Sequence, residues 1–349
     1  MASGTNGALP QDLTEDGSTG IIYGTTEAGG DLSCSEGSGM GCGAVFSYTP
    51  GRSAFRVLYK FKGGSGDGAA PMGRVAIDDN TGAIFGTTAG GGKRECPQTE
   101  SYLVRCGTIF ELMPSGSGGY TESIVHYFGG AGNLDGGQPM TGLTHGANGI
   151  FYGTTYAGGT AEECFFDAGC GVVFELSPEG SGIYAESVIY DFGPAPTNAS
   201  PIPSGVIALN GDLYGTTYWG GSCEYQFPQG CGALFSAGES TAQLTVIHSF
   251  EGPPHDGALP GGAVRETSKR IARFSAKRSP ALRYLADLQS TIADTPTVTT
   301  HVLYGNTSEG GSGGLGRSGV CSSVGCGTVY SVTVTSPLRR NPRARKSPT

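Results

Sequence analysis

The chain has 349 residues, including 63 glycines, and a formal net charge of −9. It has no strict Gly-X-Y period, which excludes collagen, and its 16 Tyr, 15 Phe and 10 Cys exclude a disordered polar chain. No run of about 18 apolar residues exists, so a membrane-spanning helix is excluded. Because the acidic charge repels phosphate backbones, we expect no nucleic-acid partner.

The chain contains a tandem repeat, marked by an aromatic-Gly-Thr-Thr anchor. The anchor begins at Tyr23, Phe85, Tyr152 and Tyr214, and a variant, Tyr-Gly-Asn-Thr, begins at Tyr304. After each anchor come, in the same order, a Gly-Gly pair, two cysteines and a Gly-x-x-aromatic segment. The anchors are spaced by 62, 67, 62 and 90 residues, which is typical of an architecture built from small repeated units.

Two further segments complete each unit. A β-rich stretch ends in phenylalanine at positions 61, 128, 192 and 250, and the fifth unit ends before it. An Asp-Gly-x-x-Pro turn begins at Asp67, Asp135 and Asp256, with Asn6 as its N-terminal counterpart. A short apolar stretch and a tight turn then lead into the next anchor, as in a β-hairpin. We interpret the repeated aspartates as turn-capping residues; a metal-binding or acid–base role is the alternative.

Each unit therefore offers four short strands with no helical periodicity between them. Four antiparallel strands in about 62 residues correspond to one propeller blade, whereas the coils of a solenoid are shorter. We predict an all-β protein, a β-propeller of about five four-stranded blades forming one domain over residues 1–336. Counting strand types gives 19, one short of a closed ring. Either a terminal segment completes the last blade, or the chain is a piece of a longer array.

The ten cysteines form five pairs, one after each anchor. The loop between partners varies in length, which a disulfide tolerates and a tetrahedral zinc site does not. We predict five disulfides and hence export to an oxidising compartment, the alternative being reduced cysteines in the cytosol. The first twenty residues show no signal-peptide pattern, so the expected secreted or cell-surface location rests on the cysteines. The predicted pairs are Cys34 and Cys42, Cys96 and Cys106, Cys164 and Cys170, Cys223 and Cys231, and Cys321 and Cys326.

A basic segment at 265–300 interrupts the last repeat. Ser279 and Pro280 resemble a helix start, and apolar residues at helical spacing follow over 282–292. We predict a short helical insertion, which is either a surface helix for an anionic lipid or acidic partner, or a solvated excursion. Residues 337–349 are predicted to form a basic, disordered tail.

The pattern of Tyr-Gly-Thr-Thr, Gly-Gly, a cysteine pair, Gly-Thr-Val-Phe and Asp-Gly-x-x-Pro resembles the GloVer tandem repeat of bacterial "choice-of-anchor" surface proteins. The resemblance covers the chain except for about 265–300 and the residues after 336. It implies an exported, multi-repeat protein of unknown activity. Members of that family commonly carry a C-terminal anchoring signal, but Pro337–Thr349 is basic with no apolar stretch before it, so anchoring is not expected here.

Motifs that carry chemistry are few. Residues 311–316 spell a dinucleotide-binding fingerprint and 310–314 a nucleophile elbow, but both lack the helix that such motifs need, so we interpret them as accidental. His126 and His248 occupy the slot that Tyr59 and Tyr190 fill in sister units, which indicates packing. We predict no catalytic residue, no metal ligand and no cofactor.

The residues directly after the anchor differ between units, and three of them are aromatic: Tyr156, Tyr218 and Trp219. They could form a rim patch for stacking on a sugar or binding a partner; the alternative is that they cover the disulfides or the adjacent blade. We predict an exported, disulfide-stapled module that binds carbohydrate or another surface protein without catalysis. The competing hypothesis is a carbohydrate-active enzyme, which needs acids from two or three blades around a central opening.

Overall fold

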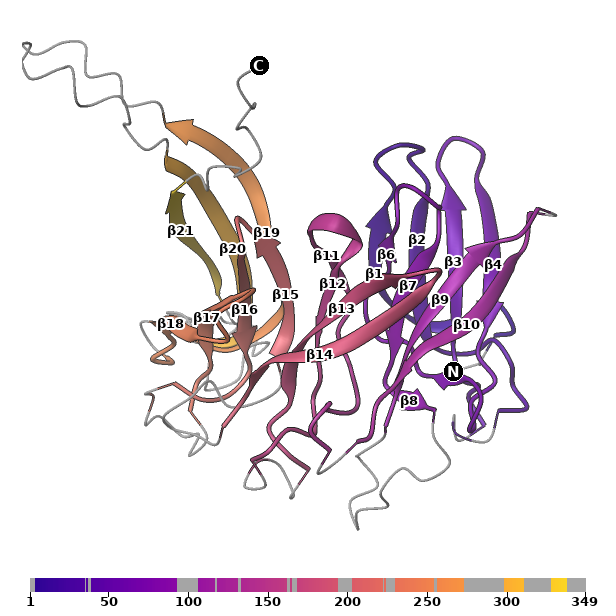
Figure 1. The fold of residues 1–349 in the computed structure, drawn as a ribbon, viewed down its shortest axis with the longest axis horizontal. Coiled ribbons are helices and arrows are strands. Elements are labelled where there is room, and N and C mark those ends of the chain that lie inside the picture. The colour runs from indigo at the N-terminus through magenta and orange to yellow at the C-terminus, as the bar shows by residue number, and fades with distance from the viewer. Residues whose placement is uncertain are drawn as a thin grey trace, which may run out of the picture.

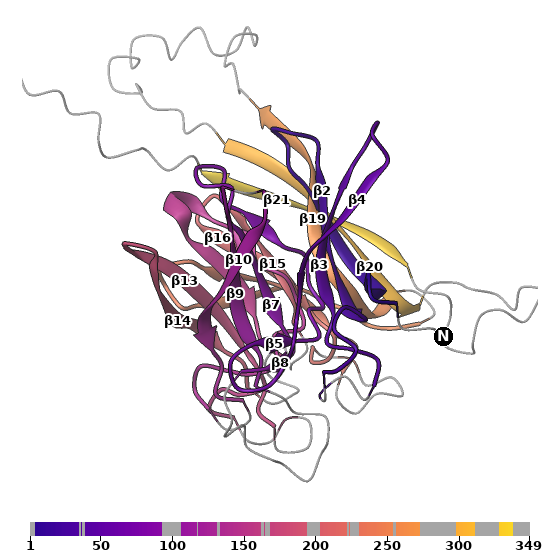
Figure 2. The same cartoon turned by 90° about the vertical axis from the view of Figure 1, so that its right-hand side faces the viewer.

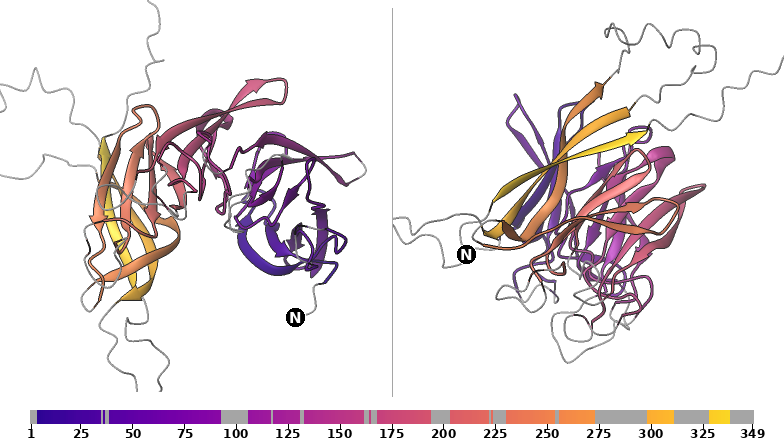
Figure 3. Two further views of the ribbon diagram at one scale, coloured as in Figure 1. Left: turned by 90° about the horizontal axis from the view of Figure 1, so that it is seen from below. Right: turned by 90° about the vertical axis from the view of Figure 1, so that its left-hand side faces the viewer.

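Five antiparallel sheets follow one another in chain order in the computed structural model (Figures 1 and 3). Within the residues that the structure describes, four of these sheets have four strands and the fifth has three. The arrangement is a five-bladed β-propeller, which confirms the predicted fold class. The structure describes residues 4–34, 36, 39–92, 106–116, 118–130, 133–161, 164, 168–193, 203–221, 223, 230–253, 256–272, 298–310 and 328–337.

Within each blade the strands pair in sequence order. Blade 1 contains β1 (Ala8–Glu15), β2 (Ile22–Ala28), β3 (Ala44–Thr49) and β4 (Ala54–Lys60); blade 2 contains β6 (Ala76–Ile77), β7 (Ile84–Thr88), β9 (Thr108–Pro114) and β10 (Tyr120–Tyr127). Blade 3 contains β11 (Thr144–His145), β12 (Phe151–Thr154), β13 (Val172–Gly180) and β14 (Ile183–Asp191); blade 4 contains β15 (Pro203–Leu209), β16 (Asp212–Thr217), β17 (Ala233–Gly238) and β18 (Leu244–Ser249). Blade 5 contains β19 (Gly257–Ala272), β20 (Val298–Gly310) and β21 (Val329–Pro337); β5 (Gly68–Ala69) pairs with β8 (Gly90–Gly91), and η1 (Ala147–Gly149) is a single 3-10 turn.

The anchor glycine is required by the aromatic residue opposite it. Gly86 on β7 pairs with Phe110 on β9, and a Cβ at Gly86 would lie 2.4 Å from Cζ of that ring. The same clash would occur between Gly153 and Phe174, at 2.3 Å. Because the fully buried ring lies across the second strand, glycine is the residue that leaves room for it.

The second anchor threonine is buried and fully hydrogen-bonded. The Thr155 hydroxyl accepts a hydrogen bond from the Val172 N–H (3.0 Å) and donates one to the Ala157 carbonyl (2.9 Å). Thr217 repeats the arrangement in the next blade. The hydroxyl thus satisfies backbone groups where the strand gives way to the cysteine loop, which explains why the motif ends in threonine.

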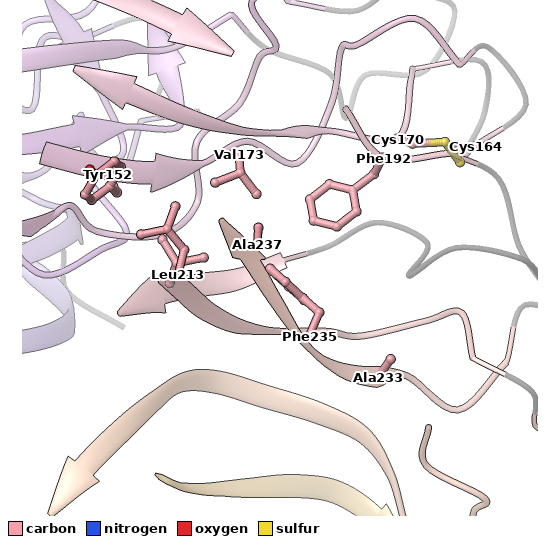
Figure 4. Packing of buried hydrophobic residues seen from close by; sticks show 10 residues of the cluster. Tyr152, Cys164, Cys170, Val173, Phe192, Leu213, Ala233, Phe235 and Ala237 are labelled. Atoms are coloured by element: carbon pink, nitrogen blue, oxygen red, sulfur yellow. A yellow bond between two sulfur atoms is a disulfide. The ribbon is translucent and has the colours of Figure 1, made fainter. Parts of the chain in front are cut away.

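Neighbouring blades meet at interfaces that we call seams, and four seams share one aromatic contact. The phenylalanine after each fourth strand packs edge-on against the third-strand aromatic ring of the next blade. The ring-centroid distances are 5.1 Å for Phe61 and Phe110, 5.3 Å for Phe128 and Phe174, 5.5 Å for Phe192 and Phe235, and 5.0 Å for Phe250 and Tyr330. Figure 4 shows the seam between blades 3 and 4. These rings dominate the buried core.

The Asp-Gly-x-x-Pro turn ties each seam to the cysteine loop of the preceding blade. The Ala70 N–H, directly before Pro71, donates a 2.9 Å hydrogen bond to the Cys42 carbonyl. The Leu259 N–H donates to the Cys231 carbonyl in the same way, at 2.8 Å. Both donors have left-handed backbones, with φ near +55°. This recurrent conformation places the proline of one blade against the glycine that follows the second cysteine of the previous blade.

The repeated aspartates cap their own turns, as interpreted from the sequence. Asp67 accepts hydrogen bonds from the Lys62 N–H (2.8 Å) and the Gly68 N–H (2.6 Å). Asp135 and Asp256 accept from the backbone N–H that follows the corresponding phenylalanine. A carboxylate that receives backbone N–H groups stabilises the turn it belongs to.

The prediction of a helical insertion from residue 265 is wrong for residues 265–272, because these residues continue β19. Their partners lie on β20, from Arg265 opposite Tyr304 to Ala272 opposite Val298. The β-branched residues of β20 favour this pairing, and the ladder satisfies backbone groups that an isolated short helix would leave to water. β19 and β20 are the longest described strands (Figure 2). The predicted helix beyond residue 272 and the tail after 337 lie outside the described residues.

Candidate functional site

A cavity of about 400 Å³ lies among the first strands of the blades. The β1 residues Leu13–Glu15 and the adjoining Asp16 and Gly17 line it, together with 74–77, Asp79, 143–145 and Arg265. Its volume falls in the range of small-molecule sites. The cavity therefore has walls from blades 1, 2, 3 and 5.

Hydrogen bonds join the blades next to this cavity. The Thr14 hydroxyl donates to the Val75 carbonyl (2.6 Å), which links blade 1 to blade 2. Nη2 of Arg74 donates to the Thr144 hydroxyl (2.8 Å), and Thr144 donates in turn to the Val206 carbonyl. These contacts connect the first strands of blades 1 to 4 and fix the position of Arg74.

The fifth blade is linked on its two sides by different polar contacts. On the side of blade 4, the Asn210 amide lies 2.7 Å from Nε2 of the fully buried His301. On the side of blade 1, Nη2 of Arg265 donates to both oxygens of Asp12, at 2.9 and 3.0 Å. The Arg265 side chain is 54% exposed and that of Asp12 is 38% exposed. An ion pair this exposed contributes about 1 kcal/mol or less.

The charge of Arg74 is affected by burial and by two neighbouring charged residues, Arg265 and Asp12. Burial lowers the pKa of its guanidinium, and the nearby charge of Arg265 lowers it further, while Asp12 acts in the opposite direction. Among the described residues Arg74 takes part in no ion pair. The two guanidinium groups are thus close enough for their charges to interact, at a cavity that Glu15, Asp16 and Asp79 also line. A guanidinium recognises carboxylate, sulfate and phosphate oxygens through paired N–H groups.

Three acids line the cavity, Glu15, Asp16 and Asp79, and of these Asp16 is engaged by its own turn, as the neighbouring Asp12 is by Arg265. Asp16 accepts hydrogen bonds from the hydroxyls of Thr19 (2.6 Å) and Ser18 (2.7 Å), and these bonds lower its pKa to about 2. Asp12 is paired with Arg265. The Asp16 carboxylate, held ionised by its hydrogen bonds, is a poor general acid at neutral pH.

Glutamates with raised pKa values lie on fourth strands instead, at the seams. Burial raises the pKa of Glu122 on β10 to about 7, aided by the charge of Asp67. Burial raises that of Glu186 on β14 to about 7 as well. The Tyr59 hydroxyl lies 3.0 Å from Asp67 and 3.4 Å from Glu122. Neither glutamate lines the cavity.

The predicted aromatic residues occupy two places. Tyr218 and Trp219 contact each other edge-on, with centroids 5.7 Å apart, and pack against a buried cluster that includes Cys231 and Phe250. Tyr156 packs in a different cluster, against two alanines, and burial raises its pKa to about 12. All three are half-buried, and none lines the cavity. A role for them in ligand binding stays a prediction.

Three of the five predicted cysteine pairs form disulfides. The Cα–Cα distances are 5.8 Å for Cys34–Cys42, 5.0 Å for Cys164–Cys170 and 5.4 Å for Cys223–Cys231. Cys106 is also disulfide-bonded. Cys96, Cys321 and Cys326 lie outside the described residues, as do the glycine-rich strings at 310–316 apart from Gly310 itself.

Sequence reasoning missed Arg74 as a site residue and counted Arg265 only as part of a basic insertion. The signal for Arg74 was its place directly before an apolar first strand, where the sister units have no arginine.

The described residues were also searched for metal sites and for membrane-spanning helices. No group of three His, Cys, Asp or Glu residues in the described ranges is arranged to hold a metal ion. No described helix has the length and apolar character needed to cross a membrane.

Comparison with solved structures finds loose similarities. A crystal structure of a nidogen/laminin complex aligns with a TM-score of 0.39 at 13% identity, over 69% of this chain and 63% of that one. TolB from Acinetobacter baumannii aligns with a TM-score of 0.41 at 9% identity, over 84% and 51%. A glycoside hydrolase family 43 arabinoxylan arabinofuranohydrolase from Bacillus subtilis aligns with a TM-score of 0.40 at 14% identity, over 85% and 58%. The chain thus spans less than two thirds of each of these proteins.

No curated protein matches the sequence. A family model, in contrast, matches a long continuous part of it, residues 32–272. This match covers the cysteine loops and seams described above and agrees with the resemblance seen in the repeat motifs. The chain belongs to the Gloeobacter/Verrucomicrobia repeat family.

Proposed function

We propose that this protein is an exported, disulfide-bonded propeller that binds an oxyanion-bearing ligand in its central cavity without catalysis. One observation carries the proposal: the Arg74 guanidinium borders the cavity, is held by Thr144, and has no acidic partner in the described residues. A bound oxyanion would neutralise the charge that Arg74 and Arg265 place together.

Binding rather than turnover is supported by the acids near the cavity. Asp12 is engaged by Arg265, and Asp16 is kept ionised by its turn. Hydrolysis of a glycosidic bond needs a protonated acid and a second carboxylate facing the same sugar. The glutamates whose pKa values suit a general acid lie on fourth strands, outside the cavity lining.

The proposed ligand class is an acidic saccharide, which combines the carbohydrate partner expected from the sequence with the neighbouring guanidinium groups of Arg74 and Arg265. Titration calorimetry with a galacturonate oligomer should show saturable binding, and the neutral galactose oligomer should bind at least tenfold more weakly. Chromatography of the same mixture should show no shortened product. Equal binding of the neutral oligomer would contradict the proposal, and release of shorter oligomers would favour the enzyme hypothesis.

A variant isolates the role of Arg74. Arg74→Lys keeps the charge but loses the paired N–H groups, so it should weaken binding about tenfold, a cost of about 1.4 kcal/mol. Arg56→Gln, which removes an exposed arginine on β4, is the matched control and should bind like the wild type. Unchanged affinity in Arg74→Lys and Arg74→Gln would remove this residue from the site.

Export is supported by the disulfides and has a separate test. Mass spectrometry of unreduced protein treated with an alkylating reagent should find no modified cysteine. Ten alkylated cysteines in protein from its native cells would contradict both the cross-links and the inferred oxidising compartment.

A further inference from the structure

We propose that the Asp12 carboxylate is a built-in competitor for the cavity, because it holds the Arg265 guanidinium that an oxyanion of the ligand needs. Asp12 thereby lowers the affinity of the site, and it leaves Arg265 when the ligand binds. This inference rests on the proposed function, since it concerns the same oxyanion site.

The contact between Asp12 and Arg265 has the form that an oxyanion ligand adopts on a guanidinium. Nη2 of Arg265 donates hydrogen bonds to both carboxylate oxygens of Asp12, at 2.9 and 3.0 Å. Arg265 lines the cavity, and so does Leu13, the residue next to Asp12 on β1. A guanidinium binds the carboxylate of a side chain and that of a ligand through the same N–H groups. The Nη2 group of Arg265 that Asp12 engages is therefore the group for which a ligand must compete.

Asp12 occupies the place in unit 1 that Arg74 occupies in unit 2. Each lies two residues before the first-strand residue that pairs with the anchor aromatic ring, which is Thr14 in blade 1 and Ala76 in blade 2. Burial and the charge of Arg265 lower the pKa of the Arg74 guanidinium, and the charge of Asp12 opposes them. Asp12 thus acts on both arginines of the cavity, on Arg265 through hydrogen bonds and on Arg74 through its charge.

The ion pair is weak enough for a ligand to displace it. The Arg265 side chain is 54% exposed and that of Asp12 is 38% exposed, so water screens their attraction. Oδ1 of Asp12 also accepts a hydrogen bond from the Leu13 N–H, at 2.9 Å, which the carboxylate can keep after it leaves Arg265. A competitor of this strength lowers ligand affinity by about fivefold, which corresponds to about 1 kcal/mol.

The acids that line the cavity differ from Asp12 in their partners. Asp16 is held by the hydroxyls of Ser18 and Thr19 in its own turn. Within the described residues, neither Glu15 nor Asp79 forms an ion pair. Replacing Asp79 by asparagine therefore removes one negative charge from the cavity without releasing a guanidinium, which makes it the matched control.

The test measures binding of the galacturonate oligomer to full-length oxidised protein by titration calorimetry. Asp12→Asn should tighten binding about fivefold, and Asp12→Ala should do the same, whereas Asp79→Asn should change the affinity by less than about twofold. Equal tightening by Asp12→Asn and Asp79→Asn would mean that only the total charge matters, and would overturn the proposal. Tightening by Asp12→Asn but not by Asp12→Ala would assign the effect to the new amide and would overturn it as well.

A double-mutant cycle tests whether the competition acts through Arg265. Arg265→Gln should weaken binding, and in that background Asp12→Asn should change the affinity by less than about twofold, because no guanidinium remains for the carboxylate to occupy. If Asp12→Asn tightens binding about fivefold in both backgrounds, the two residues act independently and the proposal is wrong.

The same titrations separate this inference from the proposed function. If the wild type binds the oligomer and Asp12→Asn binds it no more tightly, the oxyanion site stands and Asp12 is not its competitor. If neither the wild type nor Asp12→Asn binds the oligomer, the proposed function fails and this inference fails with it.

Discussion

The four complete blades and the fifth blade are built from the same repeat, yet they are held in different ways. A complete blade sends a buried phenylalanine into the next blade, as Phe128 does toward Phe174. Blade 5 has three described strands and contacts blade 1 through the ion pair of Arg265 with Asp12. Burial of an aromatic ring is worth several kcal/mol and an exposed ion pair about 1 kcal/mol or less. Among the described residues, the contact beside the three-stranded blade is thus polar where the other four seams are aromatic.

The largest expected effect concerns the aromatic seam. Phe128→Ala removes a fully buried ring, so it should lower the free energy of unfolding by about 3 to 5 kcal/mol in urea titrations. Phe55→Ala in blade 1 is the control: its ring is 49% exposed, so the loss should stay below about 1 kcal/mol. Similar losses in the two variants would mean that the seams do not dominate stability.

A second prediction compares the anchor glycine in a complete and an incomplete blade. Gly86→Ala forces a Cβ against a buried ring and should cost about 2 to 3 kcal/mol. A Cβ at Gly305 would lie 2.1 Å from the Tyr330 hydroxyl oxygen, so Gly305→Ala should cost about as much, as expected if blade 5 packs as tightly as the complete blades. The midpoint of urea unfolding measures both. A much smaller cost for Gly305→Ala would mean that the Tyr330 ring has room to move.

A third prediction concerns pH, because the fourth strands β10 and β14 carry partly buried glutamates that β4 and β18 do not have. The folded-state pKa of Glu186 is about 7, above the ordinary value of 4.5. The native state therefore favours the protonated form, and stability falls as pH rises from about 4.5 to 7. Glu186→Gln should be more stable than wild type by about 1 kcal/mol at pH 8 and equal to it at pH 4, after allowance for partial exposure. Thermal unfolding at both pH values tests this.

The matched control for the pH experiment is Glu179→Gln, which changes an exposed glutamate at the end of β13. It should leave the pH profile of stability unaltered. If Glu186→Gln stabilises the protein equally at pH 4 and pH 8, its effect does not come from the ionisation described here.

The smallest effect is expected at the polar contact of blade 5. Asp12→Asn removes the partner of Arg265 and should cost less than about 1 kcal/mol at low salt, with the difference vanishing near 1 M salt. Urea titrations at two salt concentrations provide the measurement. A loss comparable to that of Phe128→Ala would show that this ion pair, rather than the aromatic seams, holds the ring together.

Much of the fold was predictable because each repeated residue has a local physical reason. The glycine opposite Phe110, the cysteine pairs and the turn-capping Asp67 all act within one unit or between adjacent units, so their spacing appears directly in the sequence. The missing strand of blade 5 was likewise visible as an absent phenylalanine segment. The insertion predicted from residue 265 begins instead as strand over 265–272, because pairing with β20 satisfies its backbone groups, and the helical spacing over 282–292 lies outside the described residues.

The cavity was not predictable from the sequence, because its residues are far apart along the chain and do not repeat. Arg74, Thr144 and Arg265 come from three different blades, and only the closed arrangement of sheets places them near one another. The contact between Glu122 and Tyr59 of the preceding blade was not predictable either, because it also joins residues that are far apart along the chain.

The sequence by itself thus determined the repeating unit, an all-β propeller of about five blades and three cysteine pairs within the described residues, since these depend on short-range geometry that every copy must satisfy. The tertiary structure alone decided which charges meet at the centre. Their meeting depends on the curvature of the whole array, which brings the first and fifth blades together and which no single repeat encodes.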